Sequence, residues 1–73
     1  MTPTRIQLKM ALNGLGMARL DERFRRAFGG QNLERAMSGL AVKPGIFAIM
    51  VELLEKRGVE FREDGSVRVP EAG

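Results

Sequence analysis

The chain has 73 residues, the length of one small domain (1–73), and carries 12 Lys and Arg against 9 Asp and Glu, a formal charge of +3. It has no cysteine and no histidine, which excludes disulfides, thiolate metal sites and the common zinc ligand sets, so no metal or cofactor is expected. No apolar run could cross a bilayer and no signal-peptide pattern opens the chain, which predicts a cytoplasmic protein. Because so short a chain buries little surface, we expect a homodimer.

The first expected helix covers about residues 3–13. Thr2 is a suitable N-cap, Pro3 suits the first helical position, and glycines at 14 and 16 are stop signals. Ile6 and Met10 recur at helical spacing within it.

The second expected helix covers about residues 17–28 and ends at Gly29-Gly30. Its apolar face is formed by Met17, Leu20, Phe24 and Phe28. Its opposite face is charged and includes Arg19, Asp21, Glu22, Arg23, Arg25 and Arg26. A third, shorter helix fits residues 31–38, with Leu33, Ala36 and Met37 turned inward and Gly39 closing it.

Lys43-Pro44-Gly45 is expected to link to a fourth helix at about residues 45–57, which ends at Gly58. This helix is apolar almost all round, so it must be covered on several sides, by the rest of the chain or by a second copy. Alternating residues on either side of Asp64-Gly65 then predict a β-hairpin, with strands at about 59–62 and 66–69. The apolar residues expected in a dimer interface are Phe47, Met50, Val51, Leu54, Phe61, Val67 and Val69.

Catalytic machinery is not found in the sequence. Ser38 and Ser66 have no evident base beside them, and the glutamates are scattered among arginines as on solvated helix faces. The paired glycines do not follow a strand and lack the Gly-Lys-Ser/Thr of a phosphate loop. We therefore expect that the protein is not an enzyme.

Two helices joined by a tight glycine turn, the second short and polar, are typical of a helix-turn-helix. Three segments resemble phage-repressor-type (Cro-like) helix-turn-helix regulators: TPTRIQLKMALNGLGM, LERAMSGL and LLEKRGVEFREDGSVRV. The chain departs from that family's pattern in the second helix, where Arg23 and Arg26 stand at positions that are usually small or apolar. The resemblance implies a mainly α, compact four-helix helix-turn-helix domain with a C-terminal β-hairpin. It also implies a transcriptional regulator that binds double-stranded DNA as a homodimer.

In that arrangement the third helix enters the major groove. Gln31 and Asn32 are expected to bond adenine, and Arg35 is expected to reach guanine. Phosphate contacts are expected from Arg19, Arg23, Arg25, Arg26 and Lys43.

Other interpretations stay open for these residues. Asn32 is also a good helix N-cap, and the arginine run could be a solubilising face paired through Asp21–Arg25 and Glu22–Arg26. A winged-helix layout is disfavoured because the fourth helix is too apolar for a groove, although Arg62 and Arg68 of the hairpin could touch a minor groove. The alternative function is a small phage or host interaction module that binds RNA polymerase or another regulator through the fourth helix and the hairpin.

Overall fold

The first helix, α1 (Arg5–Leu15), begins with a capping box. In the computed structural model, which describes residues 2–16 and 22–70, the Thr4 hydroxyl accepts a hydrogen bond from the Gln7 N–H, and the Gln7 side chain accepts one from the Thr4 N–H. The expected cap at Thr2 and the expected start at Pro3 are therefore wrong by two residues. The helix also continues past Gly14 to Leu15, and Gly16 is its C-cap.

The residues of α1 that share a helical spacing are not all on its core side. Ile6 and Met10 are 65% and 43% exposed, whereas the buried side is formed by Leu8, Ala11, Leu12 and Leu15. Apolar residues lie all around this helix, so their spacing alone does not identify the side that packs.

Three more helices follow among the described residues: α2 (Glu22–Phe28), α3 (Gly30–Met37) and α4 (Pro44–Lys56). Phe24 and Phe28 are buried as expected, whereas Met17 and Leu20 lie outside the described residues. Both α3 and α4 end in a left-handed glycine, Gly39 (φ +78°) and Gly58 (φ +96°). In each case two backbone bonds close the helix end, such as Gly58 N–H to Glu55 and Val59 N–H to Leu54.

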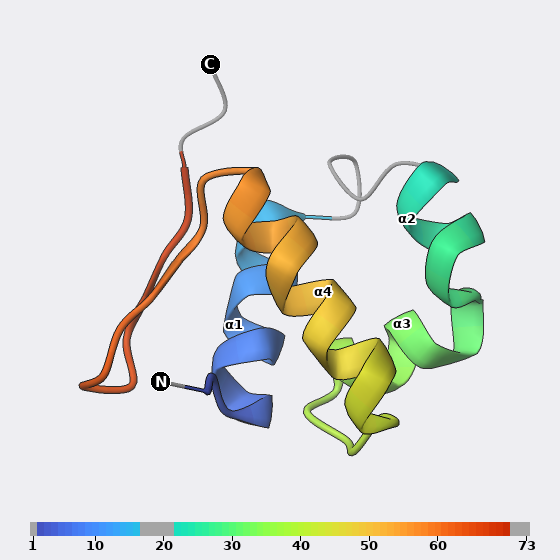
Figure 1. Cartoon of the computed structure of the whole chain (residues 1–73), viewed down its shortest axis with the longest axis horizontal. Coiled ribbons are helices and arrows are strands. Elements are labelled where there is room, and N and C mark those ends of the chain that lie inside the picture. Colours follow the sequence, from blue (N-terminus) through green and yellow to red (C-terminus); the bar gives the residue numbers. More distant parts are fainter. Residues whose placement is uncertain (1, 17–21, 71–73) are drawn as a thin grey trace.

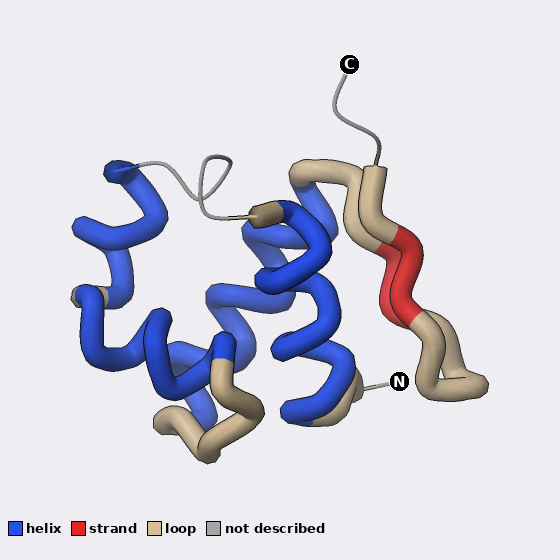
Figure 2. Tube along the Cα trace, turned by 180° about the vertical axis from the view of Figure 1, so that it is seen from behind, coloured by secondary structure: helices blue, strands red, loops and turns tan. Residues whose placement is uncertain are grey.

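The helices surround one core. α1 packs most closely on α3, α3 also contacts α2, and α4 crosses in front of α1 (Figure 1). Seen from behind, α2 and the hairpin again lie at opposite ends of the molecule, with α1 between them (Figure 2). The largest fully buried side chains are Leu8, Leu12, Met50, Leu54 and Gln7. The chain is thus mainly helical with a two-stranded hairpin at one end.

The hairpin pairs β1 (Glu60–Phe61) with β2 (Val67–Arg68) in antiparallel register, Glu60 opposite Arg68 and Phe61 opposite Val67. The hairpin and its turn at Asp64-Gly65 are confirmed, although each strand is two residues long rather than four. Gly14 of α1 lets the hairpin approach closely, because a Cβ on Gly14 would lie 2.8 Å from Cγ2 of Val69.

Gln7 fixes the hairpin to α1. Its amide nitrogen donates to the carbonyl oxygens of Arg62 (2.7 Å) and Ser66 (3.3 Å), on either side of the turn. The residue is 2% exposed, and all of its polar atoms have partners. A side chain that caps its own helix therefore also positions the last element of the described chain.

Within the turn, Asp64 accepts hydrogen bonds from the Ser66 hydroxyl (2.6 Å) and the Ser66 N–H (2.9 Å). These two bonds, with a smaller effect from the Arg62 charge, hold the pKa of Asp64 below its ordinary value of 3.8. Because the pKa of Asp64 is lower in the folded chain than in the unfolded chain, the ionised carboxylate stabilises the turn at pH values above the unfolded-state pKa. This stabilisation is lost as the pH falls through the folded-state pKa.

We therefore expect an NMR titration of the Asp64 carboxyl carbon to give a midpoint below 3.8. In Ser66→Ala the midpoint should move upward, because the hydroxyl bond that contributes most to the shift is lost. A wild-type midpoint at or above the ordinary value would contradict this account of the turn.

Candidate nucleic-acid interface

A single residue, Gly29, separates α2 from α3. It has φ +78° and serves as the N-cap of α3 without a side-chain bond. Its N–H donates to the Arg25 carbonyl at the end of α2, and its carbonyl accepts from the Leu33 N–H. Because this conformation favours glycine, one residue suffices to turn the chain from one helix into the next.

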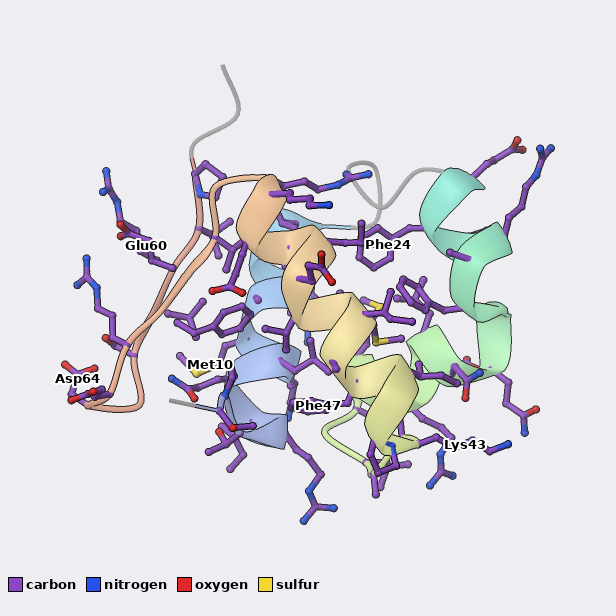
Figure 3. All side chains as sticks on the ribbon, in the orientation of Figure 1. Met10, Phe24, Lys43, Phe47, Glu60 and Asp64 are labelled. Atoms are coloured by element: carbon purple, nitrogen blue, oxygen red, sulfur yellow. The ribbon has the colours of Figure 1, made fainter. Side chains whose placement is uncertain are left out.

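The inner side of this helix pair is apolar. The rings of Phe24 and Phe28 lie 5.0 Å apart, and Leu33 and Ala36 of α3 are buried beside them. Phe24 points toward α4 (Figure 3), where the Arg57 guanidinium lies 5.2 Å from its ring centre. Since this side is held in the core, α3 presents its opposite side to solvent.

The outward side of α3 is polar over its whole length. Gln31, Glu34, Arg35 and Ser38 are exposed there, at the spacing i, i+3, i+4 and i+7 that places residues on one helix face. Together with Leu40 they line an open hollow of about 300 Å³. This surface offers an amide, a carboxylate, a guanidinium and a hydroxyl, the groups that recognise base edges.

The three residues expected to contact bases are not equivalent. Gln31 and Arg35 lie on the outward face, whereas Asn32 is half-buried and donates its amide to the Phe28 carbonyl at 2.7 Å. Asn32 is not an N-cap either, since Gly29 holds that position. The amide nitrogen instead braces the end of α2 against α3, and the contact of Asn32 with adenine stays a prediction.

Arg35 supports the loop that follows α3. Its Nε and Nη2 groups both donate to the Ala41 carbonyl, at 3.1 and 3.0 Å. Glu34 and Ser38, which share the outward face, were not expected as site residues. Counting helical positions onward from Gln31 would have found them.

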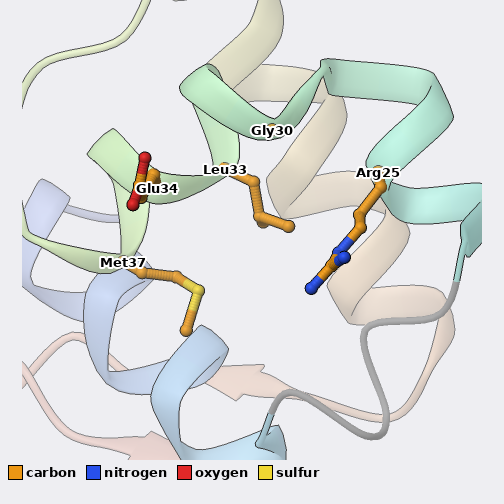
Figure 4. Close-up of a pocket in the computed structure, with 5 residues that line it drawn as sticks. All are labelled: Arg25, Gly30, Leu33, Glu34 and Met37. Carbon is orange, nitrogen blue, oxygen red and sulfur yellow. The ribbon is translucent and has the colours of Figure 1, made fainter.

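Two of the residues expected to contact phosphates, Arg25 and Arg26, lie on α2. Arg25 points into a hollow of about 250 Å³ that is lined by Gly30, Leu33, Glu34 and Met37 (Figure 4). Arg26 lies 3.5 Å from Glu22, and both side chains are more than four-fifths exposed. A pair so exposed contributes little to stability. The Glu22–Arg26 pairing is thus present, and it partly neutralises the outer side of α2.

The side chains of the remaining basic residues that were expected to contact DNA lie outside the α2–α3 pair or outside the part of the chain that the structure describes. Lys43 is exposed at the N-cap of α4 (Figure 3). Arg19, Asp21 and the side chain of Arg23 lie outside the described residues. The two arginines of the hairpin, Arg62 and Arg68, both pair with Glu60, at 3.5 and 3.6 Å.

Part of the expected dimer interface is wrong. Met50 and Leu54 are completely buried by their own chain, so a second subunit cannot contact them. The other residues named for this interface are half-buried at the edge of the core: Phe47, Val51, Phe61, Val67 and Val69. Phe47 and Val51 also line an open hollow of about 460 Å³ between α4 and residues 2–3.

Within the described residues, 2–16 and 22–70, no three acidic side chains come together in a way that could hold a metal ion. None of the helices described is long and apolar enough to cross a membrane. No family model, curated protein or solved structure matches this chain.

Proposed function

We propose that the protein is a transcriptional regulator that binds double-stranded DNA in a sequence-specific manner, with α2, Gly29 and α3 forming a helix-turn-helix. The observation that carries this proposal is the two-sided character of α3. Its inner side, with Leu33 and Ala36, is held in the core, and its outer side is a continuous polar surface. A recognition helix needs both properties, since it must be held rigidly while its side chains reach base edges in the major groove.

On this surface Gln31 supplies a donor and an acceptor that fit the edge of adenine, and Glu34 supplies an acceptor for the amino group of cytosine. Arg25 of α2 and Lys43 at the N-cap of α4 are both exposed and provide charge for the phosphates. The protein acts as a homodimer that reads two half-sites about 34 Å apart, one turn of the duplex.

The experiment is a selection of bound duplexes from a random library, followed by affinity measurements on the enriched sequence. Gln31→Ala should weaken binding to that sequence by about 1–3 kcal/mol and relax the preference at one base pair. The control is Glu55→Ala, an exposed change on α4 outside the outward face of α3, which should leave the preference unchanged. Failure to enrich any sequence would contradict the proposal.

A second candidate is a protein-interaction module, for RNA polymerase or another regulator. It is favoured by the apolar hollow beside α4, which Pro3, Val42, Phe47 and Val51 help to line. Salt distinguishes the two functions, because several phosphate contacts make DNA binding fall steeply with salt concentration. A partner held by this apolar surface should show much weaker salt dependence.

A further inference from the structure

Positive side chains from three different elements meet at the segment that joins α3 to α4. The Cδ atom of Lys9, on α1, lies 3.3 Å from the place where a Cβ on Gly39 would stand. Arg35, on α3, donates twice to the carbonyl of Ala41. Lys43 is the N-cap of α4, where this segment ends. We refer to Lys9, Arg35 and Lys43 as the loop cations.

Within residues 2–16 and 22–70, no carboxylate forms an ion pair with the loop cations. The ion pairs between described residues engage other cations, among them Arg26, Lys56, Arg62 and Arg68. The sequence explains this, because residues 2–16 and 35–51 contain no Asp or Glu. Glu34 is the one acidic residue of α3. Among the described residues, four cations elsewhere in the chain are thus paired, at Arg26, Lys56, Arg62 and Arg68, whereas no loop cation has a carboxylate partner.

The three loop cations are gathered around one short segment, which favours a partner with closely spaced negative charges. Gly39 and Ala41, which Lys9 and Arg35 contact, are two residues apart, so their Cα atoms are separated by at most about 7 Å. Duplex DNA carries one phosphate for about every 1.7 Å of its axis. Lysine is a strongly hydrated charge on a flexible stem, which suits phosphate contacts that do not depend on sequence.

We infer that the DNA surface extends beyond the α2–α3 pair to α1, with Lys9 and Lys43 contacting backbone phosphates on the side of α3 where that helix ends. This inference rests on the proposed function. It assigns to Lys9 a role that its place on the first helix did not suggest. Arg35 acts here chiefly as a positioning residue, since its two bonds to Ala41 hold the segment that carries Lys43.

The test compares Lys9→Gln, Lys43→Gln and the matched control Lys56→Gln, which removes the same charge from a lysine paired with Glu52. Affinity for the enriched duplex and for an unrelated duplex is measured between 50 and 200 mM salt. Each of the first two variants should make the slope of log affinity against log salt shallower by about 0.9. Between 50 and 200 mM salt, such a variant should lose roughly threefold less affinity than the wild-type protein loses. Both duplexes should be weakened equally.

Lys56→Gln should behave as wild type, and Lys9→Arg should restore the slope. Thermal unfolding of Lys9→Gln separates loss of charge from loss of packing on Gly39. The variant should have the same melting temperature as the wild-type protein, which shows that packing is kept and only the charge is lost. A Lys9→Gln slope equal to that of Lys56→Gln, in a wild-type protein that binds duplex DNA, overturns the inference alone. If the wild-type protein binds no duplex DNA, or binds an acidic polypeptide instead of DNA, the proposed function is overturned as well.

Discussion

Leu54→Ala is expected to lower the free energy of unfolding by about 2–5 kcal/mol at every protein concentration. Leu54 is completely buried in the core of its own chain, so the smaller side chain leaves a cavity that the neighbouring residues fill only in part. A 73-residue domain has little stability to spare, and a loss of this size should leave much of the protein unfolded.

Denaturant unfolding at several protein concentrations checks this result. Ile49→Ala is the matched control, since Ile49 lies on the same helix and is 50% exposed. Its effect should be well below that of Leu54→Ala. If the cost of Leu54→Ala grew as the protein was diluted through its dimerisation range, Leu54 would belong to a subunit contact rather than to the core of one chain.

Gln7→Leu should cost about 2–3 kcal/mol of stability, even though it replaces a buried polar residue with an apolar one of similar size. The variant loses two hydrogen bonds to the hairpin and the bond that caps the Thr4 N–H. Each such bond contributes about 1 kcal/mol. The carbonyls of Arg62 and Ser66 keep one backbone partner each, which limits the cost.

Chemical denaturation measures the total cost, and hydrogen exchange of the hairpin amides shows where it falls. Gln31→Leu is the matched control, since it makes the same change on the exposed face of α3. Gln7→Glu separates the two roles of the side chain. It keeps an acceptor for the Thr4 N–H but presents a carboxylate to two carbonyls, so it should weaken the hairpin while sparing the cap. Equal stability of Gln7→Leu and Gln31→Leu would refute the role assigned to Gln7.

The elements could be predicted from the sequence where one local signal dominates. Phe24 and Phe28 identify the buried side of α2 because charged residues occupy its other side, and glycines mark the ends of α3 and α4. The start of α1 was misplaced because two signals compete. Thr2-Pro3 suits a helix start, but Thr4 with Gln7 three residues later forms the stronger capping box.

The packing of α4 could not be predicted in the same way. It is apolar on nearly every side, so the sequence does not tell which residues face the core and which face a partner. The sequence therefore does not separate Met50 and Leu54, which are enclosed by their own chain, from Phe47 and Val51, which lie at the edge of the core.

The candidate site could be predicted in part, because the buried residues of α3 determine which of its other residues face outward. Gln31 and Arg35 lie on the outward face of α3, because Leu33 and Ala36 fix the inward one. The orientation of Asn32 and the bonds of Arg35 depend on carbonyls at Phe28 and Ala41, which only the folded chain brings within reach. The contact between Lys9 and Gly39 is of the same kind, since it joins residues that are 30 positions apart.

The bonds from Gln7 to Arg62 and Ser66 also constrain when this protein can fold during its synthesis. They join residues 55 and 59 positions apart, so the amide of the first helix finds these acceptors only after the hairpin has left the ribosome. Until then the leucines of that helix lack part of their cover. Newly made chains should therefore stay open to proteases or chaperones until the hairpin has emerged, and a product truncated before residue 66 should be sensitive to proteases.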